Sequence, residues 1–393
     1  METPQTYYWL FMLIEMKLNK NRLSFIVLAI LSCSVNLSII AQSAAGNLIA
    51  PSDRKATQET RILFSNMFKL VDSGVLIGHH DDLAYGVGWR NAQGRSDVKT
   101  ITGSFPAVYG WDLSGLELGH DADINSIPFI QQREFVRAIY ERGGISTFCW
   151  HLNNPVNGKT AWDTSIHTIA QILPGAAYHS AYKKYLDAIA SYLITLKGDK
   201  GEAIPLLFRP FHELTGTWFW WGKNTSNATD FKTLWRFTID YLRNQKGLHN
   251  LLIVYSTSDF KTGKEFLERY PGDSYADILG FDTYCRSEST KFKRDLVQSL
   301  DTLRQLTAAH HKLGSIAEIG YEGIPASDWF TKDLLPAITK KSLSYLMFWR
   351  NANTHHFYVP YSGQQSAADF TIFSKNKMTI FQNRLTPFHI YKL

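Results

Sequence analysis

One stretch of the chain combines acid–base groups with aromatic rings. The apolar run 204–208 predicts a buried strand, and an arginine, a histidine and a glutamate follow it at Arg209, His212 and Glu213. Burying a carboxylate is costly unless it is paired, so a strand has no structural need for a glutamate at its tip. Three tryptophans then stand within four residues, at positions 218, 220 and 221. A carboxyl group that moves protons, beside flat rings that cover the apolar face of a sugar, is what a site that cuts a sugar polymer needs.

A second glutamate stands at the end of another apolar run. Glu318 follows the run 314–317 and lies 105 residues beyond Glu213, which equals three units of 35 residues. In a barrel of strand–helix units this spacing places the two on the fourth and seventh strands, whose tips face each other across the mouth. Carboxyl groups about 5–5.5 Å apart would support double displacement with retention of configuration, and a wider gap would indicate inversion. The alternatives are a surface glutamate at position 318 and a buried pair of Glu213 with Arg209.

Other polar and aromatic side chains follow the predicted strands. We expect His151 and His212 to bind sugar hydroxyl groups or to orient a carboxylate, with a buried core histidine as the alternative for His151. We expect Trp218 to be the aromatic platform, and the other two tryptophans to pack against the body of the protein. Tyr284 could donate a hydrogen bond to a catalytic carboxylate, with core packing as its alternative.

The run His79-His80-Asp81-Asp82 has the residue types of a metal site. Neighbouring positions of an extended chain alternate between faces, so all four side chains cannot converge on one ion. We therefore expect hydrogen-bonding groups at a barrel rim here, and no metal. The body of the chain holds two cysteines, Cys149 and Cys285, and their placement predicts neither a disulfide framework nor a zinc site.

The elements that must position these residues repeat at a regular interval. Short apolar runs alternate with longer amphipathic stretches, and the starts of the runs lie about 38 residues apart on average, room for a strand, a helix and two loops. The eight predicted strands are 75–78, 107–111, 145–150, 204–208, 251–255, 278–282, 314–317 and 344–348. This count predicts a (β/α)₈ barrel in a single catalytic domain over residues 44–393. A doubly wound sheet is the main competitor, but no glycine-rich phosphate fingerprint follows the first strand.

Composition narrows the class of protein. With 45% hydrophobic and 19% charged residues, the chain is globular rather than disordered. The net charge is +6, but the basic residues are scattered and form no block of the kind that binds nucleic acid. Aromatic residues make up 14% of the chain, which fits a flat-faced ligand such as a carbohydrate as well as it fits a large core.

The N-terminal region reads as an export signal over residues 1–43, with Met16 as the better start. A charged stretch is followed by the apolar run 25–31 and then by small residues around Ala41, where cleavage is expected. The apolar run is too short to span a membrane. The alternative is a bacterial lipoprotein with a lipid anchor at Cys33. The sequence therefore predicts an exported protein, in the periplasm, secreted or at the cell surface.

The chain resembles glycoside hydrolase family 26, which is dominated by bacterial β-mannanases. The stretch 209–222 is similar to the acid/base motif of that family, and 315–320 is similar to its nucleophile motif. Shorter motifs match in the same order at 78–82, 150–151, 282–284 and 349–351. The resemblance extends over residues 50–393, nearly the whole of the expected mature chain.

The resemblance implies a retaining enzyme on a (β/α)₈ barrel that cleaves β-1,4-mannosidic linkages without a cofactor. Glu213 then corresponds to the general acid/base and Glu318 to the nucleophile. Trp218 corresponds to a residue that lines the mannose being cleaved, Tyr284 to one that contacts the nucleophile, and His212 to the histidine that precedes the acid/base. The residues that correspond to more distant sugar contacts are His151, Trp162 and Arg350.

Rival functions stay open from the sequence. The same barrel could act on mixed-linked β-glucan or xylan, or it could bind glycans without cleaving them. Two opposed glutamates argue against pure binding, because binding alone does not need them. The sequence does not decide between internal cleavage and release of mannobiose, nor does it fix the tolerance of galactose branches, the choice between periplasm and cell surface, or the oligomeric state.

Overall fold

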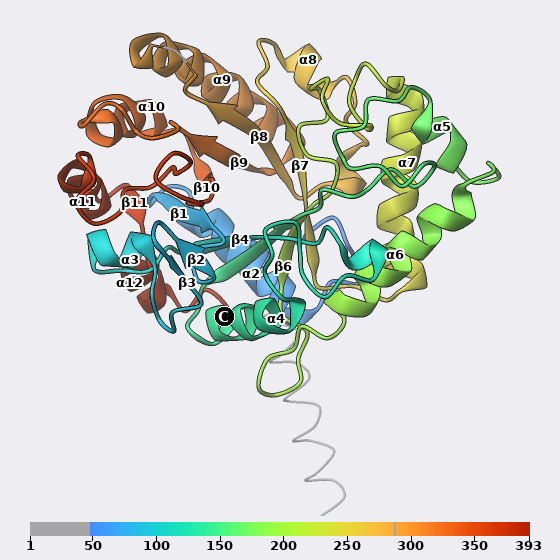
Figure 1. The fold of residues 1–393 in the computed structure, drawn as a ribbon, viewed down its shortest axis with the longest axis horizontal. Helices are drawn as coiled ribbons and strands as arrows, with labels where there is room; N and C mark the ends of the chain where they lie inside the picture. The colour runs from blue at the N-terminus through green and yellow to red at the C-terminus, as the bar shows by residue number, and fades with distance from the viewer. Residues whose placement is uncertain (1–47, 287) are drawn as a thin grey trace, which may run out of the picture. The chain divides into compact units, whose positions relative to one another are not determined.

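The computed structural model describes residues 48–286 and 288–393, and residues 49–392 form one compact unit (Figure 1). The predicted signal region, 1–43, and Cys33 lie outside the described residues. Within the described ranges, no helix has both the length and the apolar character needed to cross a bilayer.

Eight parallel strands close into a barrel, because the last of them pairs with the first. They are β1 (Val75–His80), β4 (Val108–Asp112), β5 (Ile145–Cys149), β6 (Leu206–Arg209), β7 (Leu251–Thr257), β8 (Ile278–Tyr284), β9 (Leu313–Gly320) and β10 (Leu343–Phe348). The predicted (β/α)₈ barrel is therefore confirmed, with all eight strands near their predicted positions. Several strands run two or three residues further at their carboxyl ends than predicted, because polar residues there continue the ladder.

Three short strands complete the sheets. β11 (Thr379–Ile380) pairs with the start of β1, whereas β2 (Tyr85–Gly86) and β3 (Trp89–Arg90) form an antiparallel pair in the loop that follows β1.

Helices surround the barrel on the outside (Figure 1). They are α2 (Gln58–Leu70), α3 (Asp97–Thr102), α4 (Phe129–Glu141), α5 (Thr168–Ile172), α6 (His179–Leu193), α7 (Ala228–Asp240), α8 (Gly263–Leu267), α9 (Ser289–His310), α10 (Leu335–Ile338), α11 (Ala367–Lys375) and α12 (Gln382–Leu385), with shorter helical turns η1 (Leu116–Leu118), η2 (Tyr241–Gln245), η3 (Asp273–Tyr275), η4 (Phe330–Leu334) and η5 (Thr386–Phe388). Side-chain caps start several of them. For example, Asn227 accepts a hydrogen bond from the backbone N–H of Asp230 at the start of α7.

Apolar side chains fill two separate layers. The larger layer lies between the strands and the outer helices. The smaller one fills the barrel, mainly with side chains from the first residues of the strands, such as Leu207 on β6 and Leu252 on β7. Leu63 and Met67 of α2 join this inner layer, so α2 closes the barrel at the amino ends of the strands. The carboxyl ends remain as the open mouth, where functional residues of such barrels are found.

A β-bulge in β9 decides which side chains face the mouth. Phe281 of β8 pairs with Ile316, but the next residue, Asp282, pairs with Glu318, so one extra residue, Ala317, is inserted into β9. The bulge reverses the alternation of side chains along the strand. Consequently Ile319 packs in the outer layer, and Glu318 lies beside Asp282 at the barrel mouth.

Candidate active site

Glu213 stands in a tight turn just beyond β6. The backbone of Phe211 and of Glu213 is in the left-handed region, with φ of 50° and 52°, which is uncommon for residues other than glycine and costs free energy. Hydrogen bonds hold the turn in place: Trp221 Nε1 donates to the carbonyl of His212 at 2.8 Å, and the Gly216 N–H donates to the carbonyl of Glu213 at 2.7 Å. Strain of this kind persists where the surrounding structure enforces it, and here it aims a carboxyl group into the mouth.

Two hydrogen bonds, one from a guanidinium and one from a phenol, hold the carboxylate of Glu318. Arg209, the last residue of β6, donates from Nη2 to Oε1 of Glu318, and Tyr284 donates from its hydroxyl to Oε2 at 2.6 Å. The other guanidinium nitrogen of Arg209 donates to Asp282 at 2.6 Å, and Ser256 donates to the second oxygen of that carboxylate at 2.8 Å. One buried cation therefore bridges two buried carboxylates, which is the condition under which such charges can be buried.

The two glutamates face each other at short range. One carboxylate oxygen each from Glu213, Glu318 and Asp282 lies within 4.8 Å of the other two. A separation of about 5–5.5 Å between carboxyl groups is typical of glycosidases that retain configuration, whereas inverting enzymes leave room for a water molecule between them. The arrangement fits double displacement.

The environment of Glu213 favours its protonated form. Burial, and then the negative charge of Glu318 nearby, raise the pKa of Glu213 to about 7. Trp218 opposes this rise in part, because its Nε1 donates a hydrogen bond to Glu213 Oε2 at 2.5 Å. Near neutral pH the Glu213 carboxyl group can therefore supply a proton, while Glu318 receives hydrogen bonds from a guanidinium and a phenol.

His151 and His212 form the end of a buried chain of hydrogen bonds. Asp112, the last residue of β4, accepts from Nδ1 of His151 at 2.5 Å, and Nε2 of His151 lies 3.1 Å from Nε2 of His212. Burial lowers the pKa of His151, but the Asp112 carboxylate outweighs burial and raises the pKa above its ordinary value. Burial and then the nearby positive charge of His151 lower the pKa of His212 well below its ordinary value. His151 is therefore the donor in this pair and His212 the acceptor.

The predicted site residues gather around one cavity of about 240 Å³, with Arg350 as the exception. Its lining consists of His151, Trp162, His212, Glu213, Trp218, Phe219, Tyr284, Cys285, Arg286, Glu318, Glu322, Trp349 and Tyr358. Trp162 comes from the long loop after β5, and its ring stacks on His151 with 5.1 Å between ring centroids and 14° between planes. The Trp162 side chain is 49% exposed, so one of its faces is open to a ligand.

Arg350 lies apart from this cavity. Its guanidinium is 3.3 Å from the hydroxyl of Tyr85, and that hydroxyl donates in turn to Asp81. Asn125 also donates to Asp81, at 2.9 Å. The structure thus places Arg350 in a polar cluster beside the mouth, with no contact to the two glutamates, and its predicted role in sugar binding stays a prediction.

The four residues His79 to Asp82 are all buried, but they form separate pairs instead of one cluster. His79 Nδ1 lies 2.7 Å from a carboxylate oxygen of Asp82, and His80 stacks on Trp349 with 4.4 Å between ring centroids. This arrangement matches hydrogen-bonding and packing roles at the rim. The pairing differs from the simple alternation of an extended chain, because the backbone of Asp81 has a φ of 57° and turns there, so that Asp82 lies back beside His79.

Two groups of side chains bring metal-type donors together among the described residues. One group holds Asp112, Cys149 and His151; the other holds the two glutamates and Asp282. In the first group, burial raises the pKa of the Cys149 thiol well above its ordinary value, which disfavours the thiolate that a metal needs, and Asp112 is already bound to His151. In the second group, the Arg209 guanidinium supplies the positive charge.

Some residues of the site had no role assigned from sequence. Asp112 orients His151, Asp282 shares Arg209 with Glu318, and Trp349 lines the cavity just after β10. Their position in the sequence could have identified these three residues, because each stands near the carboxyl end of a barrel strand. Glu322 and Tyr358 lie further along the loops, where strand ends give no guide.

Comparisons with known proteins agree with this geometry. The model of glycosyl hydrolase family 26 matches residues 52–358. A mannan endo-1,4-beta-mannosidase of Bifidobacterium adolescentis is 31% identical over 367 residues, which cover 86% of this chain and 36% of that protein, so the chain spans about a third of the relative's length. A mannan endo-1,4-beta-mannosidase of Bacillus subtilis is 28% identical over 67% of this chain and 73% of its own length. Among solved structures, a family 26 beta-mannanase from Bacteroides ovatus has a TM-score of 0.83 and 42% identity, over 86% of this chain and 98% of that one.

Proposed function

The chain belongs to glycosyl hydrolase family 26, and we propose that it is a β-mannanase that cleaves β-1,4-mannosidic linkages with retention of configuration. The observation that carries this proposal is the pair of half-buried Glu213 and buried Glu318, which face each other with carboxylate oxygen atoms within 4.8 Å. The relatives from Bifidobacterium adolescentis and Bacillus subtilis are mannan endo-1,4-beta-mannosidases, which supports mannan as the substrate.

In the first step the Glu213 carboxyl group gives its proton to the glycosidic oxygen while Glu318 attacks the anomeric carbon. The bond between that carbon and the glycosidic oxygen breaks, the leaving part of the chain departs with the proton, and a mannosyl ester forms on Glu318. In the second step Glu213, now a carboxylate, takes a proton from water. The water oxygen bonds to the anomeric carbon, the ester bond breaks, and Glu318 is released as a carboxylate.

The groups around Glu318 prepare it for attack. The hydrogen bonds from Arg209 and Tyr284 stabilise its charged form and fix its direction, so the attacking oxygen needs little reorientation. The raised pKa of Glu213, about 7, leaves a large fraction of this acid protonated near neutral pH, where the first step needs the proton. The two carboxyl groups thus take different roles because their neighbours differ.

Aromatic and imidazole groups complete the site. Trp218 both contacts Glu213 and lines the cavity, which suits a platform for the sugar that is cleaved. His212 and His151 lie on the same wall and can bind sugar hydroxyl groups, and Trp162 extends the wall outward.

Within this activity, we infer internal cleavage of the mannan chain. A cavity of about 260 Å³ adjoins the catalytic one at His151 and Trp162, and another of about 530 Å³ adjoins it at Tyr284 and Arg286. Sugar units can therefore extend from the catalytic pair on both sides of the barrel mouth. This supports endo-action over the release of mannobiose from chain ends.

The test is a time course of products from mannohexaose and galactomannan, beside reducing-sugar release from mannan, mixed-linked β-glucan and xylan. We expect activity on mannan, a fall in galactomannan viscosity at low conversion, and a spread of oligosaccharides from the earliest points. Mannobiose alone from the start would contradict internal cleavage. Greater activity on β-glucan or xylan would contradict the substrate, and binding without products would contradict catalysis. The variant Glu213→Gln serves as the control for contaminating activity.

We also propose that the protein is exported by the signal in residues 1–43. The proposal rests on the sequence pattern of charged, apolar and small residues. Cell fractionation with Cys33→Ser beside the unaltered chain tests it: a soluble periplasmic or secreted protein in both cases fits ordinary cleavage, whereas membrane association lost in the variant would indicate a lipid anchor. Retention of the unaltered protein in the cytoplasm would contradict export.

A further inference from the structure

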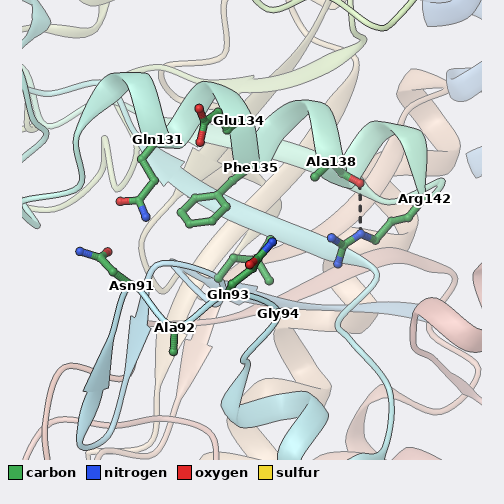
Figure 2. A pocket seen from close by; sticks show the side chains of 10 residues that line it. Asn91, Ala92, Gln93, Gly94, Gln131, Glu134, Phe135, Ala138 and Arg142 are labelled. Carbon is green, nitrogen blue, oxygen red and sulfur yellow. Dashed lines mark hydrogen bonds between the residues drawn. The ribbon is translucent and has the colours of Figure 1, made fainter.

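A groove of about 440 Å³ runs along α4 on the outer wall of the barrel, away from the catalytic cavity. Figure 2 shows it between this helix and the loop that follows β3. Its lining consists of Leu83, Asn91, Ala92, Gln93, Gly94, Gln131, Glu134, Phe135, Ala138 and Arg142. None of these residues lines the catalytic cavity. The volume lies within the range of about 300–1,000 Å³ that is typical of ligand sites.

The helix side of the groove is one continuous stripe. Gln131, Phe135, Ala138 and Arg142 follow one another at intervals of three or four residues, so they share one face of the helix. The Phe135 ring is fixed from behind, since it stacks on the buried ring of Trp111 with 5.6 Å between centroids and 10° between planes. The groove therefore has a rigid aromatic side chain in its wall without help from a ligand.

The polar groups of the groove suit an uncharged ligand rich in hydroxyl groups. The carboxamides of Asn91, Gln93 and Gln131 make no hydrogen bond to another residue in the ranges 48–286 and 288–393, so their donors and acceptors are available. Figure 2 shows these three groups on the two facing walls, with Phe135 between them. Carboxamides around a fixed aromatic ring bind sugar hydroxyl groups at the sides and an apolar sugar face in the middle. One carboxylate, Glu134, and one guanidinium, Arg142, leave no excess charge that would select an ionic ligand.

We propose that this groove is a second binding site for the mannan chain, separate from the catalytic mouth. The proposal rests on the proposed function, because it takes the enzyme's own polymer as the occupant. The loop that leaves the barrel mouth after β1 also lines the groove, since Leu83 is a lining residue and stands three residues after the end of that strand. A polymer held along the outer wall would keep other parts of the same chain at high local concentration near the mouth, as linked sites do in general.

This arrangement predicts a benefit for polymers and none for short substrates. No residue lines both the groove and the catalytic cavity or its two neighbours, so we expect a mannopentaose bound in those cavities to leave the groove empty, whereas a galactomannan chain is long enough to occupy both places. Changes in the groove should therefore lower the affinity for polymer and kcat/KM on polymer, and leave kcat/KM on mannopentaose unchanged.

The experiment compares the double variant Gln93→Ala/Gln131→Ala with Phe135→Ala and with the control Ile130→Ala. Ile130 is exposed on the same helix but does not line the groove. Affinity electrophoresis in galactomannan gels, in a Glu213→Gln background that does not degrade the gel, measures binding. Rates on galactomannan and mannopentaose are measured with Glu213 intact. Thermal midpoints show whether Phe135→Ala, which removes the stack on Trp111, still folds; the double variant decides the question if it does not.

We expect both groove variants to lose most of the retardation in the gel, and kcat/KM on galactomannan to fall on the order of tenfold. The control should match the unaltered protein. Unchanged retardation in the double variant would overturn the proposal, and so would an equal loss of activity on polymer and on mannopentaose. A loss of retardation in xylan or β-glucan gels with no change in galactomannan would also overturn it. If the unaltered chain fails to cleave mannopentaose, the proposed function fails, while the gel measurement still decides the groove.

Discussion

The two ends of the barrel are built on opposite principles. At the amino ends of the strands the interior is filled by leucine, isoleucine, valine and methionine side chains, and α2 closes it. At the carboxyl ends, the interior holds buried charges and hydrogen-bonded polar groups such as Arg209, Asp282 and Glu318. The first end gains free energy from burying apolar surface. The second end costs free energy, because its ions must be desolvated and its backbone is held at unfavourable φ angles at Phe211 and Glu213.

We therefore expect that the stability and the chemistry of this barrel can be altered separately. A change at the amino end should alter the free energy of unfolding and leave the catalytic geometry intact. A change at the mouth should alter the rate far more than the fold.

The largest effect should come from the two glutamates. Glu318→Ala removes the nucleophile, and loss of the nucleophile in a hydrolase costs on the order of 10⁶-fold in kcat. Glu213→Ala removes the general acid/base, whose contribution is typically about 10²- to 10⁴-fold. Rates on mannohexaose measure the loss, and thermal unfolding and circular dichroism measure the fold, which we expect to be retained. Near-normal activity in either variant would refute the assignment.

A substitution at the amino end of the barrel should lower the stability and leave the catalytic rate nearly unchanged. Leu63→Ala or Met67→Ala removes a side chain from the inner layer under the barrel and should lower the free energy of unfolding by about 2–5 kcal/mol. The kcat at 25 °C should stay within about twofold of that of the unaltered protein, because the substitution lowers the stability of the folded state without moving the catalytic side chains. Denaturant unfolding and initial rates test this. A large drop in kcat in a folded variant would show that the two ends are coupled.

The pH dependence should reveal the electrostatics of the mouth. Glu213 must carry a proton in the first step, and its pKa in the free enzyme is about 7. We therefore expect kcat/KM to fall about tenfold per pH unit above pH 7, as the free enzyme loses this proton. In Glu318→Gln the repelling charge is gone, so the pKa of Glu213 should decrease, which a carboxyl carbon NMR titration would show. An unchanged pKa in that variant would mean that burial alone, without the charge of Glu318, sets the value.

The smallest effect should come from strain at the amino end. His311 ends α9 in the left-handed region, with φ of 52°, and is exposed. His311→Gly should be neutral or stabilise the protein by about 0.5–1 kcal/mol, because glycine adopts this φ without strain but gives the unfolded chain more freedom. Activity should not change. A clear loss of stability would show that the His311 side chain makes a contribution beyond its backbone position.

The barrel could be predicted from sequence because each strand is buried on both faces. Such strands appear as continuous apolar runs, and their spacing leaves little choice of topology. The acid/base residue was visible for the same reason, since Glu213 interrupts the pattern directly after the run 204–208.

Other features depend on contacts that are distant in the sequence. The β-bulge at Ala317, which turns Glu318 into the mouth, has no local signature in an apolar run. The pairing of Asp112 with His151 joins residues 39 positions apart, at the end of β4 and just after the neighbouring strand β5. Arg350 follows the eighth strand as predicted, yet its contact with Tyr85 depends on where the loop after β1 lies. The groove along α4 was not foreseen, because Phe135 looks like an ordinary core residue in an amphipathic helix.

The anomeric configuration of the first product decides whether Glu318 is the nucleophile. Proton NMR of mannohexaose hydrolysis, followed from the first minutes at high enzyme concentration, separates the α and β anomers before mutarotation mixes them. The short distance between Glu213 and Glu318 predicts that the β anomer appears first and the α anomer only later. If the α anomer appeared first, water would be attacking directly, Glu318 would not be the nucleophile, and the proposed mechanism would be wrong.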